Sequence, residues 1–220
     1  MTAPFTSLPF PDLLARIASK DPAPGGGSAS ALAGALAAAL AGMVGGLTVG
    51  KAGYEATFEE AEALARQADA LGARLVAAAE ADAAAFDAVM AAMARPKATD
   101  DEKATRKAAM QQAFQGATAA PLGVARTCLE AGSLALRLVA IGNRNATSDA
   151  AVGVLLAVTG AEGSLFNVAI NLGSIQDAGF AEAARAEAEG LWAEAARLRE
   201  ALWGTAAAAG LPSPRVGVPA

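Results

Sequence analysis

The sequence predicts an all-α protein, a bundle of about seven helices with two long central helices rich in alanine and glycine. Hydrophobic residues make up 54% of the 220 residues but aromatic residues only 5%, because alanine dominates the composition. Alanine is the best helix former, whereas the β-branched and aromatic residues that favour strands are scarce. A chain of this length can bury a substantial core. We therefore expect a single domain over residues 1–210 and a loose tail over residues 211–220.

Proline and glycine mark where the first two helices begin and end. A short amphipathic helix over residues 12–19 ends before a Pro-Ala-Pro sequence, because proline restricts the residue before it and lacks a backbone donor. Three glycines at 25–27 then lead into an uncharged helix that reaches about residue 49. Ser28 is the N-cap expected for this helix.

Capping residues and prolines divide the rest of the chain into five more helices. Thr99 followed by Glu102 has the spacing of a capping box. Pro121 suits the first turn of a helix, where its missing N–H costs little. Thr147 or Ser148 is expected to cap the helix that follows. The expected helices span residues 55–93, 101–118, 121–141, 148–172 and 177–209.

Charge and composition exclude several classes of function. The net charge is −5, so we expect no nucleic-acid partner, because phosphate binding needs a cationic surface. The chain has one cysteine, Cys128, and no histidine, which excludes an intrachain disulfide and a zinc site of the usual nitrogen and sulfur ligands. Any general acid or base must then be an aspartate, glutamate, lysine, tyrosine or the lone cysteine.

The uncharged stretch from residue 25 to residue 50 is long enough to span a bilayer. We interpret it as the packed centre of a bundle, because it is mostly alanine and glycine, with few of the large residues that favour lipid. Gly42 and Gly46 have the spacing that allows close helix contact. The first eleven residues lack the charged-then-apolar order of a signal peptide. We therefore expect a cytoplasmic protein with no membrane partner.

Asp82 interrupts an apolar stripe on the long third helix. At 3.6 residues per turn it lies near the middle of this stripe, whose other members are Leu75, Ala79, Phe86, Val89 and Met93. A carboxylate is costly to bury unless it is paired or hydrogen-bonded. Two interpretations remain open: a carboxylate satisfied by an arginine or a helix cap nearby, or one whose pKa is raised for proton transfer.

Two glycine-rich features could bind a ligand or serve packing alone. The glycines before residue 28 precede a helix N-terminus, whose backbone N–H groups can bind an anion, although a simple turn is the alternative. In the helix over 148–172, Asp149 and Asn167 share a face with three glycines that permit close contact with a helix or a ligand. About 27 Å separates these two residues on a straight helix. Both could hold one small group only if the helix breaks near residues 160–163 or if subunits share a site.

Five short motifs occur in order: Pro22-Ala23-Pro24-Gly25-Gly26-Gly27-Ser28, Asp82-Ala83-Ala84-Ala85-Phe86, Pro96-Lys97, Gly142-Asn143 with Ser148-Asp149, and Phe166-Asn167-Val168-Ala169-Ile170-Asn171-Leu172. In these motifs the chain resembles, from about residue 7 to residue 206, the cyclodeaminase/cyclohydrolase family. That family includes the C-terminal domain of formiminotransferase-cyclodeaminase and stand-alone methenyltetrahydrofolate cyclohydrolases. One departure is Arg95, where the family usually has leucine.

The resemblance implies an all-helical fold that forms a homodimer and binds a folate in a cleft, with Asp82 as the catalytic aspartate. In the cyclohydrolase reaction, water adds to the methenyl carbon; in the cyclodeaminase reaction, N10 attacks the formimino carbon and ammonia leaves. One carboxylate can carry the proton in either case, so we expect no metal and no cofactor. The substrate-binding residues implied by the resemblance are Gly25, Gly26, Gly27, Ser28, Lys97, Asn143, Ser148, Asp149, Asn167 and Asn171.

Between the two reactions we expect the cyclohydrolase, in which 5,10-methenyltetrahydrofolate is hydrolysed to 10-formyltetrahydrofolate. This chain carries no formiminotransferase that would supply the substrate of a cyclodeaminase. The formiminotetrahydrofolate cyclodeaminase remains the alternative. A non-catalytic helical dimer module is a third possibility, and such a module would bind no folate and lose nothing when Asp82 is changed.

Overall fold

The computed structural model describes residues 4–212, and every regular element in that range is helical. This confirms the all-α class. The α-helices are α1 (Phe10–Ile17), α2 (Gly26–Thr48), α3 (Phe58–Met93), α4 (Asp100–Ile141), α5 (Thr147–Leu172) and α6 (Ala178–Ala208). Three 3₁₀ turns precede helices: η1 (Phe5–Ser7) before α1, η2 (Glu55–Thr57) before α3 and η3 (Arg144–Ala146) before α5.

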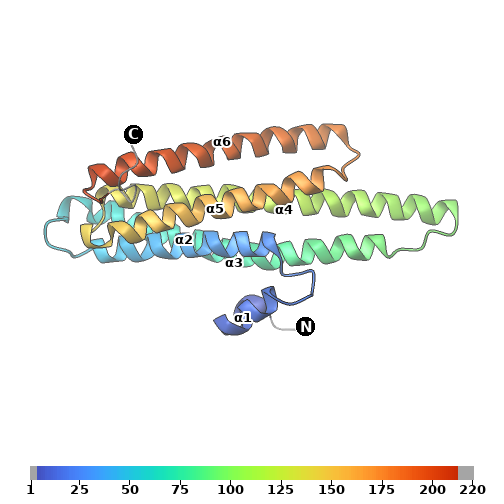
Figure 1. Cartoon of the computed structure of the whole chain (residues 1–220), viewed down its shortest axis with the longest axis horizontal. Coiled ribbons are helices and arrows are strands. Elements are labelled where there is room, and N and C mark those ends of the chain that lie inside the picture. Colours follow the sequence, from blue (N-terminus) through green and yellow to red (C-terminus); the bar gives the residue numbers. More distant parts are fainter. Residues whose placement is uncertain (1–3, 213–220) are drawn as a thin grey trace.

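The helices form an elongated bundle in which α2, α3, α4 and α5 run side by side (Figure 1). Helix α6 packs along α4 and α5 on one side, whereas α1 stands away from the bundle on the other. The alanine- and glycine-rich helices α2 and α5 each contact three other helices, as their composition predicted. Helix α4 contacts four, so it is as central as they are.

The expected count of seven helices was wrong by one, because α4 is a single helix where two were expected. The two helices expected over 101–118 and 121–141 are one continuous helix with Pro121 inside it. Proline lacks the N–H that would bond the carbonyl oxygen of Ala117, four residues earlier. Asn171 of α5 supplies the missing donor, because its Nδ2 lies 2.6 Å from that oxygen. A tertiary contact therefore keeps the helix intact where its sequence suggests a break.

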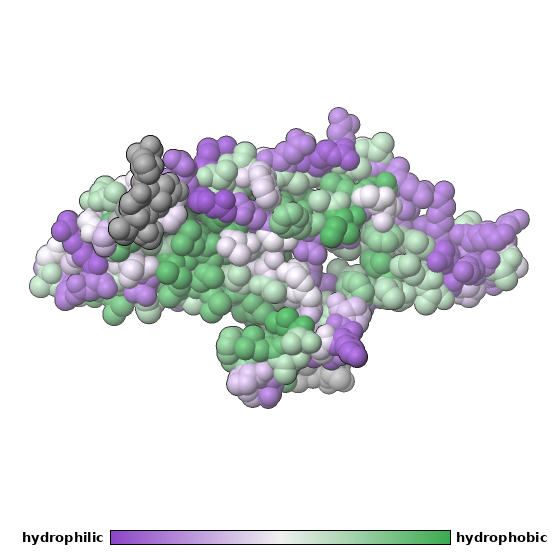
Figure 2. All heavy atoms as spheres, viewed as in Figure 1, coloured by the Kyte–Doolittle hydropathy of each residue, from purple (hydrophilic) through white to green (hydrophobic). Residues whose placement is uncertain are grey.

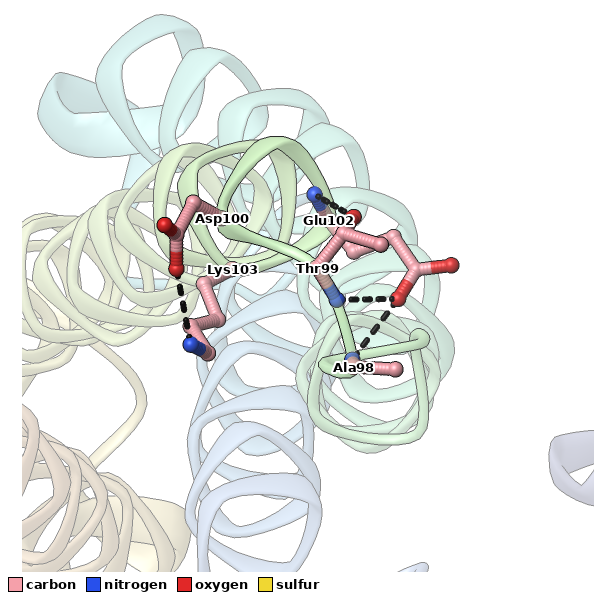
Figure 3. A network of polar contacts seen from close by, with 5 residues as sticks. All are labelled: Ala98, Thr99, Asp100, Glu102 and Lys103. Carbon is pink, nitrogen blue, oxygen red and sulfur yellow. Dashed lines mark hydrogen bonds and ion pairs between the residues drawn. The ribbon is translucent and has the colours of Figure 1, made fainter.

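The capping expectations are met at one of three helix starts. Thr99 and Glu102 form the capping box of α4 (Figure 3): Glu102 N–H donates to Thr99 Oγ1 at 3.2 Å, and Thr99 N–H donates to Glu102 Oε2 at 3.0 Å. The cap of α2 is Gly25, not Ser28, and the cap of α5 is Ala146, not Thr147 or Ser148. The turn η3 runs directly into α5, so its residues leave no room for a side-chain cap.

Small residues allow α2 to lie very close to its neighbours. A Cβ on Gly45 would be 2.8 Å from the carbonyl oxygen of Ala61, so this residue makes the close approach to α3. A Cβ on Gly46 would meet nothing within 4 Å, so the close contact expected at Gly46 lies one position earlier, at Gly45.

Near the C-terminus, Leu211, the first residue of the expected loose tail, packs against the core. The rest of the expected tail, from residue 213, lies outside the described residues.

Candidate active site

The carboxyl group of Asp82 meets the first turn of α2. Asp82 is half-buried on α3, and the hydroxyl of Ser28 lies 3.1 Å from its Oδ2. The same hydroxyl lies 3.0 Å from the carbonyl oxygen of Ala79, one turn earlier on α3. A Cβ on Gly27 would lie 2.6 Å from the carboxyl carbon of Asp82. A side chain at residue 27 would therefore displace this carboxyl group or push the two helices apart.

The carboxyl group of Asp82 lies at the first turn of α2, a helix without a side-chain cap of its own. The N-cap, Gly25, has no side chain to bond the free N–H groups of the first turn. A carboxylate is favoured at this end because the helix dipole and these N–H groups attract negative charge. The N–H of Ser28 is one of the groups that stabilise the charged form of Asp82. The anion at the glycine-rich turn is thus supplied by the protein itself.

Burial dominates the titration of this carboxyl group. Desolvation raises the pKa of Asp82 above its ordinary value, and hydrogen bonds from the hydroxyl and N–H of Ser28 lower it in part. Among the ion pairs of residues 4–212, none involves Asp82. A carboxyl group satisfied by a hydrogen bond and one with a raised pKa, posed as alternatives by the sequence, therefore occur together in Asp82.

Helix α5 reaches the same end of α2 through glycine packing. A Cβ on Gly160 would be 2.6 Å from the carbonyl oxygen of Ser30, and one on Gly163 would clash with the Ser30 hydroxyl. Asn167, one turn beyond Gly163, therefore lies at the Asp82 end of the bundle. Its Nδ2 donates to the carbonyl oxygen of Gly163 at 3.1 Å, and the residue is half-buried.

Asn143, Ser148 and Asp149 lie at the opposite end of α2. The N–H of Asn143 donates to Thr48 Oγ1 at 2.9 Å, and its Nδ2 donates to the carbonyl oxygen of Leu47 at 3.1 Å. About 30 Å of helix separates this last turn of α2 from Ser28. Helix α5 is unbroken, so a single chain does not bring these residues to Asp82.

Two other residues of the implied set lie away from the carboxyl group. Lys97 is exposed beyond the end of α3, and α3 extends about 16 Å from Asp82 to Met93 before that point. Asn171 bonds the carbonyl that Pro121 leaves free, as described above. The sequence did not reveal this role, because Pro121 was expected in the first turn of a helix, where no donor would be missing.

Asp82 does not line either of two cavities of the bundle. An apolar cavity of about 600 Å³ lies between α5 and α6 and is lined by Phe166 and Trp192. A second, of about 650 Å³, lies between the α1 segment and α3, where Glu80 and Asp87 line the side of α3 away from Asp82.

Burial raises the pKa of the Cys128 thiol to about 12, so this thiol is not a nucleophile near neutrality. Within the described range, no group of three or more histidine, cysteine, aspartate or glutamate residues could hold a metal ion.

Known proteins are similar to this chain in sequence and in fold. A family model described as formiminotransferase-cyclodeaminase matches residues 9–190. The chain is 42% identical over 189 residues to a methenyltetrahydrofolate cyclohydrolase of Methylorubrum extorquens. The aligned region covers 86% of this chain and 91% of that protein. It is 35% identical over 187 residues to the formimidoyltransferase-cyclodeaminase of Sus scrofa, covering 85% of this chain but only 35% of that protein.

A solved structure has the same helical arrangement. The crystal structure of formiminotetrahydrofolate cyclodeaminase from Thermotoga maritima superposes with a TM-score of 0.82 at 28% sequence identity, covering 92% of this chain and 97% of that one. The chain thus spans nearly all of two relatives and about a third of the formimidoyltransferase-cyclodeaminases it matches.

Proposed function

Because the chain belongs to the formiminotransferase-cyclodeaminase family, we propose that it is a methenyltetrahydrofolate cyclohydrolase, which hydrolyses 5,10-methenyltetrahydrofolate to 10-formyltetrahydrofolate. The observation that carries this choice is the 42% identity to a protein of that name over 91% of its length. The local chemistry at Asp82 agrees with it, since the reaction needs one group that can both accept and donate a proton.

The proposed mechanism uses Asp82 as general base and then as general acid. Its carboxylate takes a proton from water as the oxygen bonds to the methenyl carbon. The delocalised positive charge of the methenyl group is stabilised by the same carboxylate before the attack. A half-buried carboxyl group with a raised pKa suits this work, because it holds a proton closer to neutrality than an exposed aspartate does.

A formiminotetrahydrofolate cyclodeaminase is the second candidate. The fold similarity to the Thermotoga maritima cyclodeaminase favours it. In that reaction N10 attacks the formimino carbon, and Asp82 protonates the departing ammonia. The same residue would act in both reactions, so geometry alone does not separate them.

A paired assay separates the candidates. Methenyltetrahydrofolate absorbs in the near ultraviolet, and ring opening removes that band, so the purified protein should accelerate its loss well above the buffer rate. Release of ammonia from 5-formiminotetrahydrofolate, without that acceleration, would replace the cyclohydrolase with the cyclodeaminase. Activity in neither assay, with no folate binding, would leave a non-catalytic dimer module.

We propose that substrate lies at the Asp82 end of the bundle, against the glycine-rich turn and Asn167. Lys97, at the tip beyond α3, is then available only to the far part of an elongated substrate. Ser148 and Asp149 take part only if a second subunit brings them to Asp82, as a two-fold pairing with the bundles antiparallel would do. Asn143 and Asn171 have a structural role, since their side-chain amides donate hydrogen bonds to backbone carbonyls.

The proposed assembly is a homodimer through the face made by α2 and α5. Figure 2 shows hydrophobic residues gathered over these two helices. Contiguous exposed apolar patches mark interaction surfaces. Light scattering at micromolar concentration should give the mass of two chains. The large exposed residues on this face are Leu36, Met43, Leu47, Val152, Leu155, Phe166 and Ile170.

We also propose that the enzyme works in the cytoplasm, away from membranes and nucleic acids, and without a metal or cofactor. Two helical segments, Gly26–Thr48 and Arg144–Leu172, are long and apolar enough to cross a membrane by length and composition. About half of each is buried against other helices, which supports a role in the bundle core. Chelator treatment should leave the proposed activity unchanged, because water and one titrating carboxyl group suffice.

A further inference from the structure

The hydroxyl group of Ser28 has two acceptors within hydrogen-bond distance. The carbonyl oxygen of Ala79 lies at 3.0 Å and Oδ2 of Asp82 at 3.1 Å. A serine hydroxyl has one hydrogen to donate but can also accept a hydrogen bond, whereas the carbonyl can only accept. Ser28 is fully buried, so its hydroxyl is confined to these partners.

Two hydrogen-bond arrangements fit the same positions of the heavy atoms. When Asp82 is charged, Ser28 donates to its Oδ2. When Asp82 is protonated on Oδ2, the carboxyl group donates to Ser28 Oγ, and the serine hydrogen turns to the carbonyl of Ala79. Both forms of the carboxyl group are satisfied, so neither helix has to move when the proton arrives or leaves.

We propose that Ser28 is a positioning residue, which holds the carboxyl group of Asp82 in one place while that group takes a proton from water and returns it to the substrate. This inference rests on the proposed cyclohydrolase function. It assigns Ser28 a role through Asp82 and not through contact with the folate. Gly27 completes the arrangement, because only glycine lets the carboxyl group approach the first turn of α2.

The two proton transfers balance as follows. An O–H bond of water breaks, its proton moves to Asp82, and the oxygen bonds to the methenyl carbon. Asp82 then gives the proton to N5 as the carbon–N5 bond breaks and its electron pair stays on nitrogen. The hydroxyl proton of the adduct leaves to solvent as the formyl C=O bond forms, so Asp82 ends as the carboxylate it began as.

Few charged groups on the surrounding elements compete with Ser28 as partners of Asp82. Helix α2 carries none from Gly26 to Thr48, and α4 carries none over residues 108–125. On α3, Asp87 is exposed, and Glu80 accepts a hydrogen bond from the N–H of Thr6. On the other elements, Arg16 pairs with Asp21 beside α1, and Glu162 of α5 pairs with Arg199 of α6.

Ser30 provides a matched control on the same helix. Its hydroxyl bonds the carbonyl oxygen of Gly26 at 2.8 Å, within α2, whereas the hydroxyl of Ser28 crosses to α3. Ser28→Ala and Ser30→Ala therefore remove one hydroxyl each, and only the first removes a partner of Asp82. Ser28→Cys keeps a side chain of similar size with a weaker hydrogen-bond donor, so it replaces the alanine variant in the test if that variant folds poorly.

Two measurements test the proposal: the acid limb of kcat against pH with methenyltetrahydrofolate, and an NMR titration of the ¹³C-labelled Asp82 carboxyl group, assigned by its loss in Asp82→Asn. In Ser28→Ala both should move upward by about one pH unit, because a hydrogen bond to the charged carboxylate is lost. At neutral pH kcat should fall several-fold while KM changes less than about twofold. Ser28→Cys should shift less, in the same direction, and Ser30→Ala should not shift.

Turnover by the wild type decides the proposed function, and the variants decide the role of Ser28. An Asp82 titration that moves while the acid limb of kcat stays in place would overturn the positioning role and leave the cyclohydrolase standing. Equal behaviour of Ser28→Ala and Ser30→Ala in both measurements would overturn it as well, because the hydroxyl of Ser28 would then be one structural group among others.

Discussion

At the first turn of α2 the hydroxyl of Ser28 meets a carboxyl group from α3, whereas at the last turn the hydroxyl of Thr48 meets the backbone N–H of Asn143. Asp82 is the titrating group at the first end, and the Asn143 side chain bonds the Leu47 carbonyl at the other. Both ends carry residues of the family-like motifs. The difference separates motif residues that can do chemistry from those that hold helix ends together.

The largest effect should come from removing the titrating proton. Asp82→Asn keeps the shape and a hydrogen-bonding group, so folate binding and the fold should survive. Turnover should fall about a hundredfold or more, the usual contribution of a general acid–base group. Asp87→Asn is the control, because Asp87 is exposed on the other side of α3. Similar small losses in the two variants would return Asp82 to a structural role.

The close contact at Gly27 should tolerate no side chain. Gly27→Ala places a methyl group 2.6 Å from the carboxyl carbon of Asp82, so α2 and α3 must separate or Asp82 must turn. We expect a loss of about 1–3 kcal/mol in unfolding free energy and at least a tenfold loss of kcat. Gly26→Ala meets nothing within 4 Å, so it should be as stable as the wild type in the same denaturant series.

At the opposite end, Asn143→Ala should cost stability and spare chemistry. It leaves the carbonyl of Leu47 and the N–H of Asn145 without their partner, a loss of about 1–3 kcal/mol. The kcat of the folded fraction should stay within about twofold of the wild type. A large fall in kcat with normal stability would mean instead that this end reaches an active site, which requires a second subunit.

The bond between Asn171 and Ala117 can be tested through Pro121. Asn171→Ala should destabilise the protein by about 1–2 kcal/mol, because a carbonyl in the helix loses its donor. In a Pro121→Ala background the same change should cost less, since the restored N–H can bond Ala117. Additive effects in this double-mutant cycle would contradict the compensation.

The smallest effect is a pH dependence of stability. Burial raises the pKa of Asp82 above its ordinary value of 3.8, so the folded protein holds this proton more tightly than the unfolded chain. That contribution is complete below about pH 3.8 and is lost as the pH rises through the folded-state pKa. The wild type should therefore lose stability relative to Asp82→Asn as the pH rises from about 4. A constant difference in urea titrations would argue against a raised pKa.

Local chemistry made part of the fold and the site predictable. Alanine content predicts helices, and the spacing of Thr99 and Glu102 predicts a capping box, because each depends on neighbours within one or two turns. The position of Asp82 on an apolar stripe predicts a carboxyl group under desolvation, since the period of a helix decides which residues turn inward.

Contacts between distant segments decided the rest. The sequence by itself determined the helical class, the uncharged core helix and the unusual place of Asp82. Only the tertiary structure decided that α4 continues through Pro121, since the donor comes from Asn171, 54 residues from Ala117. Likewise, Asp82 approaches the first turn of α2 because Gly27 has no side chain there, and about 30 Å of helix separates Ser28 from the last turn of α2. Such relations depend on how helices pack, which no local pattern specifies.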